Sequence, residues 1–416
     1  MGCGHKAIRP GFLTFFSICE GNLTDSADCP ANVGATAGDR ASDLHHRSVV
    51  IDTHVDTTQR IAFDAFDLGL RHDNGSVDIP RMRAGGVDAV FFAIWTPPNI
   101  TGPVAVERAL SQIEAVRREV ERLRVHLQLA TDAKGIRLAK ENGRIAILLG
   151  IEGGHLINND LANLRKFHDL GARYMTLTHS ANVDWADSST DEPAHNGLTE
   201  FGREVIRTMN RLGMMVDISH VSDRTFYDAL DESEAPLVAT HSCCRALCDS
   251  PRNLSDEMIQ ALAAAGGVVQ VNFHTGFLSQ AFRNRMKAEP EIQRFIDGEA
   301  RGRCGENDAC QLLESSKLVR ELVRDGKLPR VDWTEILDHI DYAVKLVGAD
   351  YVGLGSDFDG AYMPHGMEDA SHLPQITSAL LKKGYSEENI QRILGGNMLR
   401  LMQDVQSNAQ QMEGTR

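Results

Sequence analysis

Eight short, almost continuously apolar segments alternate with longer amphipathic ones, and this alternation limits the fold more than any other feature. The apolar segments are residues 49–54, 87–95, 144–153, 173–180, 214–220, 236–242, 267–274 and 351–360. Such runs are typical of parallel strands buried on both faces. Helical patterns lie between them, for example at residues 105–123, 198–213 and 254–266. In the last of these, Ser255 suits the N-cap and Gly266 the position after the C-cap.

Eight strands that alternate with helices predict an α/β fold of the (β/α)8 TIM-barrel type. The competing fold is a doubly wound open sheet, which more often carries a glycine-rich phosphate loop after its first strand. Residues 53–60 contain no glycine, so the barrel is favoured. Residues 275–350 separate the seventh and eighth strands. We expect them to form a helical excursion near the active-site mouth, because they hold too few apolar residues for a separate core.

The barrel domain is expected to span residues 48–405, with an N-terminal tail at 1–47 and a C-terminal tail at 406–416. In the N-terminal tail, Lys6 and Arg9 precede the apolar stretch GFLTFFSI, which suits a weak signal peptide followed by a linker. A disordered or wrongly assigned start is an equal alternative. The sequence therefore slightly favours an exported protein, periplasmic or secreted, over a cytoplasmic one.

The charge balance limits the partners. With 43 basic and 58 acidic residues, the net charge is −15. Such a surface repels phosphate backbones and anionic lipid, so we expect neither nucleic acid nor a membrane surface as a partner. We also expect no membrane span, because no apolar run approaches the roughly 18 residues that one requires.

The eight cysteines lack the paired CxxC spacing of a structural zinc site. In a chain of this size, isolated cysteines are mostly buried and act as small apolar side chains, which is the favoured interpretation. Cys304 and Cys310 lie in the polar excursion and would form a disulfide in an exported protein, which is the less favoured interpretation.

Histidines and carboxylates stand at the ends of six predicted strands. They are His54 and Asp56 (first strand), Glu152 (third), His179 (fourth), His220 (fifth), His241 (sixth) and Asp357 (eighth). In a barrel, these ends converge on one rim, where such enzymes place catalysis. A single histidine after a strand is more often structural. Burying several such groups together without a cation, however, costs too much desolvation energy, so the pattern predicts a metal centre.

The ligand types narrow the choice of metal. Imidazoles and carboxylates without thiolates suit zinc, manganese or iron, and zinc is the default. Two ions need a bridging group, and Glu152 stands on a strand between the HxD strand and the later histidine strands. We predict two zinc ions, with hydroxide between them. One is held by His54, Asp56 and Glu152, and the other by Glu152, His220 and His241.

The motifs around these residues resemble the M19 family of renal-type (membrane) dipeptidases, in the amidohydrolase superfamily. The similarity runs from about residue 45 to residue 403. Its motifs are IDTHVD, GIEGGH, RYMTLTHSANVDWADS, HNGLTEFGREVIRTMNRLGMMVDISHVS, ATHS, RNLSDE, GLGSDFDG and ILGGNMLRL. The resemblance implies a zinc metalloprotease that hydrolyses dipeptides, and it suggests a homodimer.

The resemblance also implies roles beyond metal binding. His179 resembles the group that polarises the scissile carbonyl and stabilises the oxyanion, and Arg252 the clamp for the C-terminal carboxylate of the substrate. Asp357 resembles the residue that meets the free amino group and passes a proton to the leaving amine. An arginine fork suits a carboxylate, and charged groups at both ends of a short pocket would exclude longer peptides. Val55 stands where many relatives have asparagine.

Two other functions stay open. The same fold could hydrolyse another amide, a lactone or a modified peptide, for example in natural-product tailoring. A catalytically silent metal-binding protein is the second, although retention of the full residue set argues against it. Among other residues, we expect His155 and Asp359 to support the site from outside the metal ligands. Trp185 should pack in the core, His274 could line the pocket, and His45 should lie at the surface.

Overall fold

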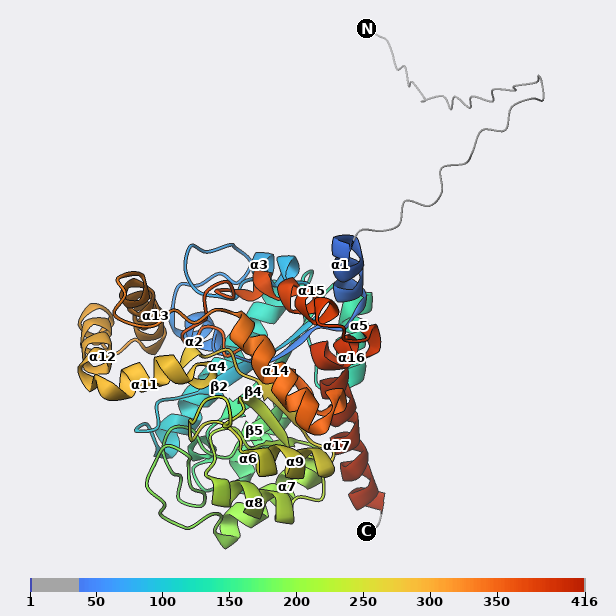
Figure 1. Ribbon diagram of the computed structural model, residues 1–416. Coiled ribbons are helices and arrows are strands. Elements are labelled where there is room, and N and C mark those ends of the chain that lie inside the picture. Colours follow the sequence, from blue (N-terminus) through green and yellow to red (C-terminus); the bar gives the residue numbers. More distant parts are fainter. Residues whose placement is uncertain (2–36, 415–416) are drawn as a thin grey trace, which may run out of the picture. The chain divides into compact units, whose positions relative to one another are not determined.

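Eight parallel strands form a nearly closed barrel in the computed structural model, which describes Met1 and residues 37–414 (Figure 1). The barrel strands are β1 (Ile51–Val55), β2 (Ala89–Trp95), β4 (Ile145–Glu152), β5 (Ala172–Thr176), β6 (Met215–Asp217), β7 (Val238–Ser242), β8 (Val268–Val271) and β9 (Val352–Leu354). Val55 forms a parallel bridge with Phe358, which brings β1 beside the segment after β9. The predicted barrel is confirmed, and the open doubly wound sheet is wrong. The sequence did not predict β3 (Leu127–Leu129), a short strand that pairs with β4 outside the barrel path.

Helices surround the barrel and connect its strands. They are α1 (Ala37–Arg47), α2 (Thr58–Phe63), α3 (Ile79–Ala84), α4 (Gly102–Arg122), α5 (Ala133–Glu141), α6 (Leu161–Asp169), α7 (Glu200–Leu212), α8 (Asp223–Glu232), α9 (Asp256–Ala264), α14 (Thr334–Val347), α15 (Pro374–Lys382), α16 (Glu387–Gln391) and α17 (Asn397–Gly414). The Ser255 side chain accepts a hydrogen bond from the Met258 N–H at the start of α9. Gly266 follows this helix with φ +80°. Both predicted end signals of α9 are therefore present.

The predicted helical excursion between β8 and β9 is also present. It consists of α10 (Thr275–Leu278), α11 (Gln280–Ala288), α12 (Pro290–Cys304) and α13 (Asp308–Arg324). Helices α12 and α13 lie side by side at the edge of the barrel (Figure 1). Ile296 and Leu318 are buried within the same apolar cluster as the barrel residues. The excursion therefore packs as part of the barrel domain.

Cysteine pairing differs from the favoured interpretation. Cys304 and Cys310 form a disulfide that closes the turn between α12 and α13. Within residues 37–414, Cys243, Cys244 and Cys248 are buried and unpaired, as expected. Disulfides are typical of proteins that leave the reducing cytosol, and export stays a prediction. The expected signal peptide and the three cysteines before residue 37 lie outside the described residues.

The residues on the outer side of both predicted domain boundaries, at 48 and 405, are helical and pack against the barrel domain. Helix α1 packs against α15, with Leu44 fully buried. Helix α17 packs against α7 and buries Ala409. The expectation that His45 is exposed is wrong, because α1 packs down and buries it. Its Nδ1 lies 2.7 Å from the Thr377 hydroxyl and its Nε2 lies 2.8 Å from the Gly85 carbonyl oxygen.

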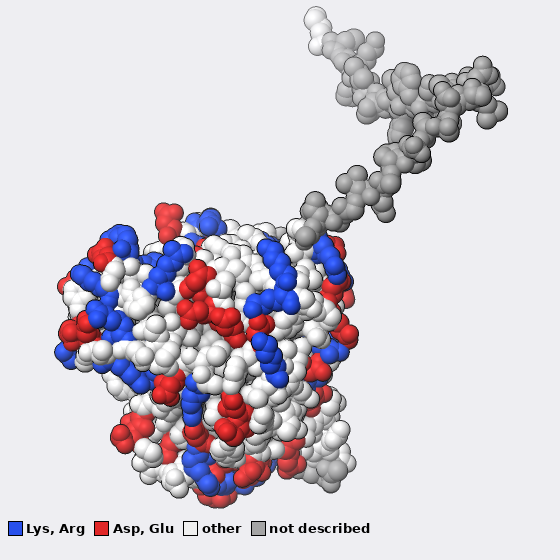
Figure 2. All heavy atoms as spheres, viewed as in Figure 1, with Lys and Arg blue, Asp and Glu red and all other residues white. Residues whose placement is uncertain are grey.

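The surface carries both signs of charge. Acidic and basic side chains are interspersed over the face shown in Figure 2. Among the described residues, no helix is both long and apolar enough to cross a membrane.

Candidate metal centre and active site

All eight predicted site residues meet at the carboxyl ends of the barrel strands. His54 lies in β1, Glu152 ends β4 and His241 lies in β7, while the others stand in the segments just after strands: Asp56 after β1, His179 after β5, His220 after β6, Arg252 after β7 and Asp357 after β9. All except His179, His220 and Asp357 are fully buried. The convergence follows from barrel geometry, because parallel strands deliver their carboxyl ends to one rim.

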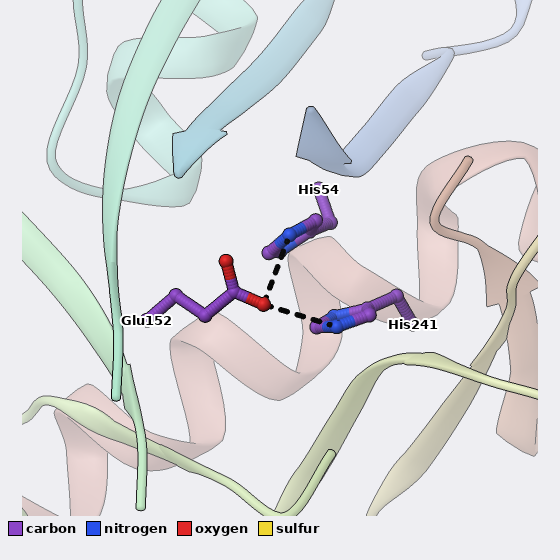
Figure 3. Close-up of side chains that lie close together, drawn as sticks. All are labelled: His54, Glu152 and His241. Atoms are coloured by element: carbon purple, nitrogen blue, oxygen red, sulfur yellow. Dashed lines mark ion pairs between the residues drawn. The ribbon is translucent and has the colours of Figure 1, made fainter. Parts of the chain in front are cut away.

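One oxygen of Glu152 stands at the centre of the histidines. Its Oε1 lies 3.5 Å from His54 Nε2 and 3.4 Å from His241 Nε2 (Figure 3). The same oxygen is 3.0 Å from His220 Nε2 and 3.8 Å from His179 Nε2. The arrangement brings four imidazoles around a single carboxylate oxygen.

The Nε2 atoms of these histidines are better placed to bind cations than to hydrogen-bond one another. His220 Nε2 and His241 Nε2 lie 2.9 Å apart, and His54 Nε2 is buried without a hydrogen-bond partner among the described residues. Imidazole lone pairs that face one another in a buried site are what a divalent cation satisfies. Three groups have ligand atoms within 4.8 Å of one another: His54, Glu152 and His241; Glu152, His179 and His220; His54, Asp56 and Asp357. All five predicted metal ligands belong to these groups, which divide them differently from the two predicted sets and also include His179 and Asp357.

Electrostatics of the bare protein point the same way. Burial disfavours the charged form of His54, but the neighbouring Glu152 and Asp56 raise its pKa to about 10. Burial raises the pKa of Asp56 well above its usual range, assisted by the like charges of Glu152 and Asp357. Burial lowers the pKa of His220 and of His241, which favours the neutral imidazole that metals bind. The first two shifts arise because several ionisable groups are packed together in a buried site.

Arg252 has free hydrogen-bonding capacity in the buried site. One terminal nitrogen donates to the His241 carbonyl oxygen at 3.3 Å, and the guanidinium lies 5.2 Å from the centre of the Phe277 ring. Its Nε and Nη1 are buried and unpartnered within the described part of the chain. Since buried polar groups almost always find partners, these donors are available to an anionic ligand.

Asp357 and His179 border the same space. Asp357 Oδ2 accepts a hydrogen bond of 2.9 Å from the Asn272 amide. Burial raises the pKa of Asp357, but the positive charges of His241 and His54 outweigh it and lower the value overall. His179 Nδ1 is buried and has no partner among the residues described. A carboxylate and an imidazole therefore face the cavity with unused capacity.

The cavity itself has a volume of about 180 Å3. Its walls add five residues to which the sequence analysis assigned no role or, for His274, only a lining position: Trp95, His274, Phe277, Leu312 and Gly360. Trp95 ends β2, so the strand-end rule that found the histidines would also have found it. Leu312 comes from the excursion helix α13, and the local sequence gives no sign that this helix reaches the site.

Three residues at this rim have strained backbone conformations. Apart from asparagines, the non-glycine residues with positive φ in the described chain are His220 (+69°), Asp357 (+65°) and Asp359 (+67°). Such conformations cost of order 1–3 kcal/mol and persist where the surroundings enforce them, often at functional sites. The three residues follow β6 and β9, where the chain turns over the cavity.

The sequence predicted that His155 and Asp359 support the site without binding metal and that Trp185 packs in the core. His155 Nε2 lies 3.1 Å from the Thr96 hydroxyl, and burial lowers its pKa to about 4. Asp359 accepts hydrogen bonds from the Thr57 hydroxyl at 2.7 Å and the Ser76 N–H at 2.6 Å. Trp185 is buried in the core.

Comparisons with known proteins identify the family of this chain. The family model described as membrane dipeptidase (peptidase family M19) matches residues 38–416. Dipeptidase 3 of Mus musculus is 33% identical over 82% of this chain, and human Dipeptidase 3 is 32% identical over 88%. This chain spans 60% of the length of mouse Dipeptidase 3, 59% of the length of Dipeptidase 3 of Rattus norvegicus, and 67% of the length of the human protein.

Solved structures give the same assignment. The "probable dipeptidase PvdM" of Pseudomonas aeruginosa superposes with a TM-score of 0.77 at 26% identity, over 90% of this chain and all of the other. A metallo peptidase of Rhodobacter sphaeroides, liganded with a phosphinate mimic of the dipeptide L-Ala-D-Ala, has a TM-score of 0.71 at 26% identity, over 86% of this chain and 99% of the other. The fold, the converging ligand set and the family match together show that this chain belongs to the membrane dipeptidase family of metallopeptidases, M19.

Proposed function

We propose that the protein is a zinc-dependent dipeptidase with two zinc ions per chain. The observation that carries the proposal is the set of imidazoles around Glu152, beside a buried arginine with unused donors. When bound, the two ions would polarise the scissile carbonyl and lower the pKa of the attacking water. His54, Asp56 and Glu152 would hold one ion, and Glu152, His220 and His241 the other.

The remaining residues would position the substrate. Arg252 would bind the C-terminal carboxylate with its free Nε and Nη1 donors, as a planar fork suits two oxygens. Asp357, held by Asn272, would accept a hydrogen bond from the substrate ammonium and pass a proton to the leaving amine. His179 would donate a hydrogen bond to the carbonyl oxygen as negative charge develops there.

A panel of small peptides tests the proposed function. We expect the zinc-loaded protein to hydrolyse free dipeptides and the chelated protein to lose this activity until zinc is added back. N-acetylated dipeptides and tripeptides should be poor substrates, because the pocket would pin both charged ends. Hydrolysis of N-acyl amino acids or lactones in preference to dipeptides would favour another amidohydrolase activity. Zinc binding without turnover of any substrate would favour a silent metal-binding protein.

Cavity size suggests small side chains. The volume of about 180 Å3 is below the roughly 300–1,000 Å3 of pockets for drug-sized ligands. The Rhodobacter sphaeroides relative is liganded with a mimic of a dipeptide of alanines, which supports short side chains at both positions. We propose that Leu312 helps to set this limit, because it narrows the cavity from α13.

Shortening Leu312 should widen the substrate range. For Leu312→Ala we expect kcat/KM for a leucine- or phenylalanine-containing dipeptide to rise about tenfold relative to Ala-Ala, as pocket contacts of this size are worth roughly 10–200-fold. Leu313→Ala is the matched control, since Leu313 lines a different cavity and should leave the ratio unchanged. An unchanged ratio in Leu312→Ala would remove this residue from the specificity pocket.

A further inference from the structure

A buried carboxylate lies behind one of the proposed zinc-binding histidines. Asp217 ends β6 and accepts four hydrogen bonds. Its Oδ1 accepts from the backbone N–H groups of Ser219 (3.0 Å) and Thr240 (2.9 Å). Its Oδ2 accepts from the hydroxyl of Thr240 at 2.6 Å and from the hydroxyl of Thr176. With two donors on each oxygen, the carboxylate acts only as an acceptor.

The hydroxyl of Thr240 has one proton, and its direction decides the next contact. Because Asp217 can only accept, Thr240 must donate its proton to Oδ2 and can then only accept from its other neighbours. One of these is His241 Nδ1, at 2.8 Å. His241 must therefore carry its proton on Nδ1. Its Nε2, 3.4 Å from Glu152 Oε1, presents a lone pair.

Tyr174 stands behind the other histidine, His54. Its phenol oxygen lies 2.9 Å from His54 Nδ1. His54 Nε2 is buried and lacks a partner among the described residues. Tyr174 and His54 therefore form a second contact behind the metal position, separate from that of Asp217.

The barrel makes room for both contacts. A Cβ atom at Gly150 would lie 1.9 Å from the Cζ atom of Tyr174, so only glycine at this point of β4 leaves space for the ring. Asp217, Thr240 and Tyr174 are fully buried, as are both histidines. Water therefore has no ready access to replace one of the partners.

We propose that Asp217, acting through Thr240, fixes the Nδ1–H tautomer of His241. The carboxylate would thereby aim the Nε2 lone pair of this histidine at the metal position. Asp217 and Thr240 are positioning residues that touch no substrate. This inference rests on the proposed two-zinc function, and it assigns that function's ligand geometry to a network outside the ligands.

Asp217→Asn reverses the direction of the hydrogen bond to Thr240 and keeps the size of the side chain. The asparagine carbonyl must face the two backbone N–H groups now bound by Oδ1, so its amide takes the place of Oδ2 and donates to Thr240. The Thr240 proton is then free to point at His241 Nδ1, which would move the histidine proton to Nε2. We expect zinc affinity to fall 10–100-fold, the usual effect of losing a partner that orients a metal ligand.

The experiment is a zinc titration of the metal-stripped full-length protein against a chromophoric chelator. Thr240→Val should weaken one of the two zinc-binding steps, because it releases His241. Thr240→Ser, which keeps the hydroxyl, should bind like the unsubstituted protein. Rescue by the conservative variant is a readout that a general loss of packing would not produce.

Thr176→Val is the matched control, because it removes the other hydroxyl on Asp217 Oδ2 and touches neither histidine. It should lower thermal stability and leave both zinc-binding steps unchanged. Equal loss of affinity in Thr176→Val and Thr240→Val would overturn the inference, and so would normal binding in Thr240→Val. An unsubstituted protein that binds no zinc would instead overturn the two-zinc proposal, and the inference with it.

Discussion

Glu152→Gln is expected to lower kcat at least about a thousandfold, or roughly 4 kcal/mol in activation free energy. Glu152 Oε1 lies within 3.8 Å of the Nε2 atoms of four histidines. A glutamine keeps the shape but replaces one oxygen with an amide that donates, so it cannot bridge two cations. We also expect fewer than two zinc ions per chain. Steady-state kinetics and metal analysis of the same preparation measure both effects.

The control for this prediction is the same substitution at Glu121, an exposed residue on α4 whose ion-pair partner Arg124 is also exposed. Surface changes of this kind usually alter stability by less than about 0.5 kcal/mol, so Glu121→Gln should keep both ions and full activity. A Glu152→Gln protein that held two zinc ions and hydrolysed dipeptides at the normal rate would refute the bridging role.

Arg252→Ala is expected to lower kcat/KM for free dipeptides roughly 30–5,000-fold, because losing one partner of a buried charge pair costs about 2–5 kcal/mol. The same change should scarcely affect a C-terminally amidated dipeptide, which offers no carboxylate. Arg252→Lys should restore part of the loss, since lysine keeps the charge without the planar fork.

The ratio between free and amidated substrates separates recognition from structural damage. Arg252 also donates to the His241 carbonyl oxygen and lies over Phe277, so its removal disturbs the site in other ways that act on both substrates equally. Equal losses for the two substrates, with zinc content unchanged, would show that Arg252 is not the carboxylate clamp.

The barrel and the convergence of the site residues could be predicted because both follow from patterns local in the chain. Apolar runs mark the strands, and the residues just after them share one rim in any parallel barrel. His54, Glu152 and His241 were found in this way, although Figure 3 shows them coming from strands far apart in sequence. The homodimer that the family resemblance suggests stays a prediction.

Other features depend on contacts between distant segments. His45 looked like a surface residue because nothing in its own helix shows that α15 covers it. Leu312 reaches the cavity only because the excursion packs back onto the barrel. Cys304 and Cys310 are close in sequence, but pairing required the turn between α12 and α13 to bring their sulfurs together.

The sequence by itself determined the fold class and which ionisable residues meet at one rim, because strands and their ends can be recognised from short segments of the chain. Only the tertiary structure decided how those residues face one another. Thr176, Asp217 and Thr240 lie on three strands, and their hydrogen bonds depend on the stagger of those strands around the barrel. The periodicity of a single strand does not reveal that stagger, so the network behind His241 forms only when the barrel closes.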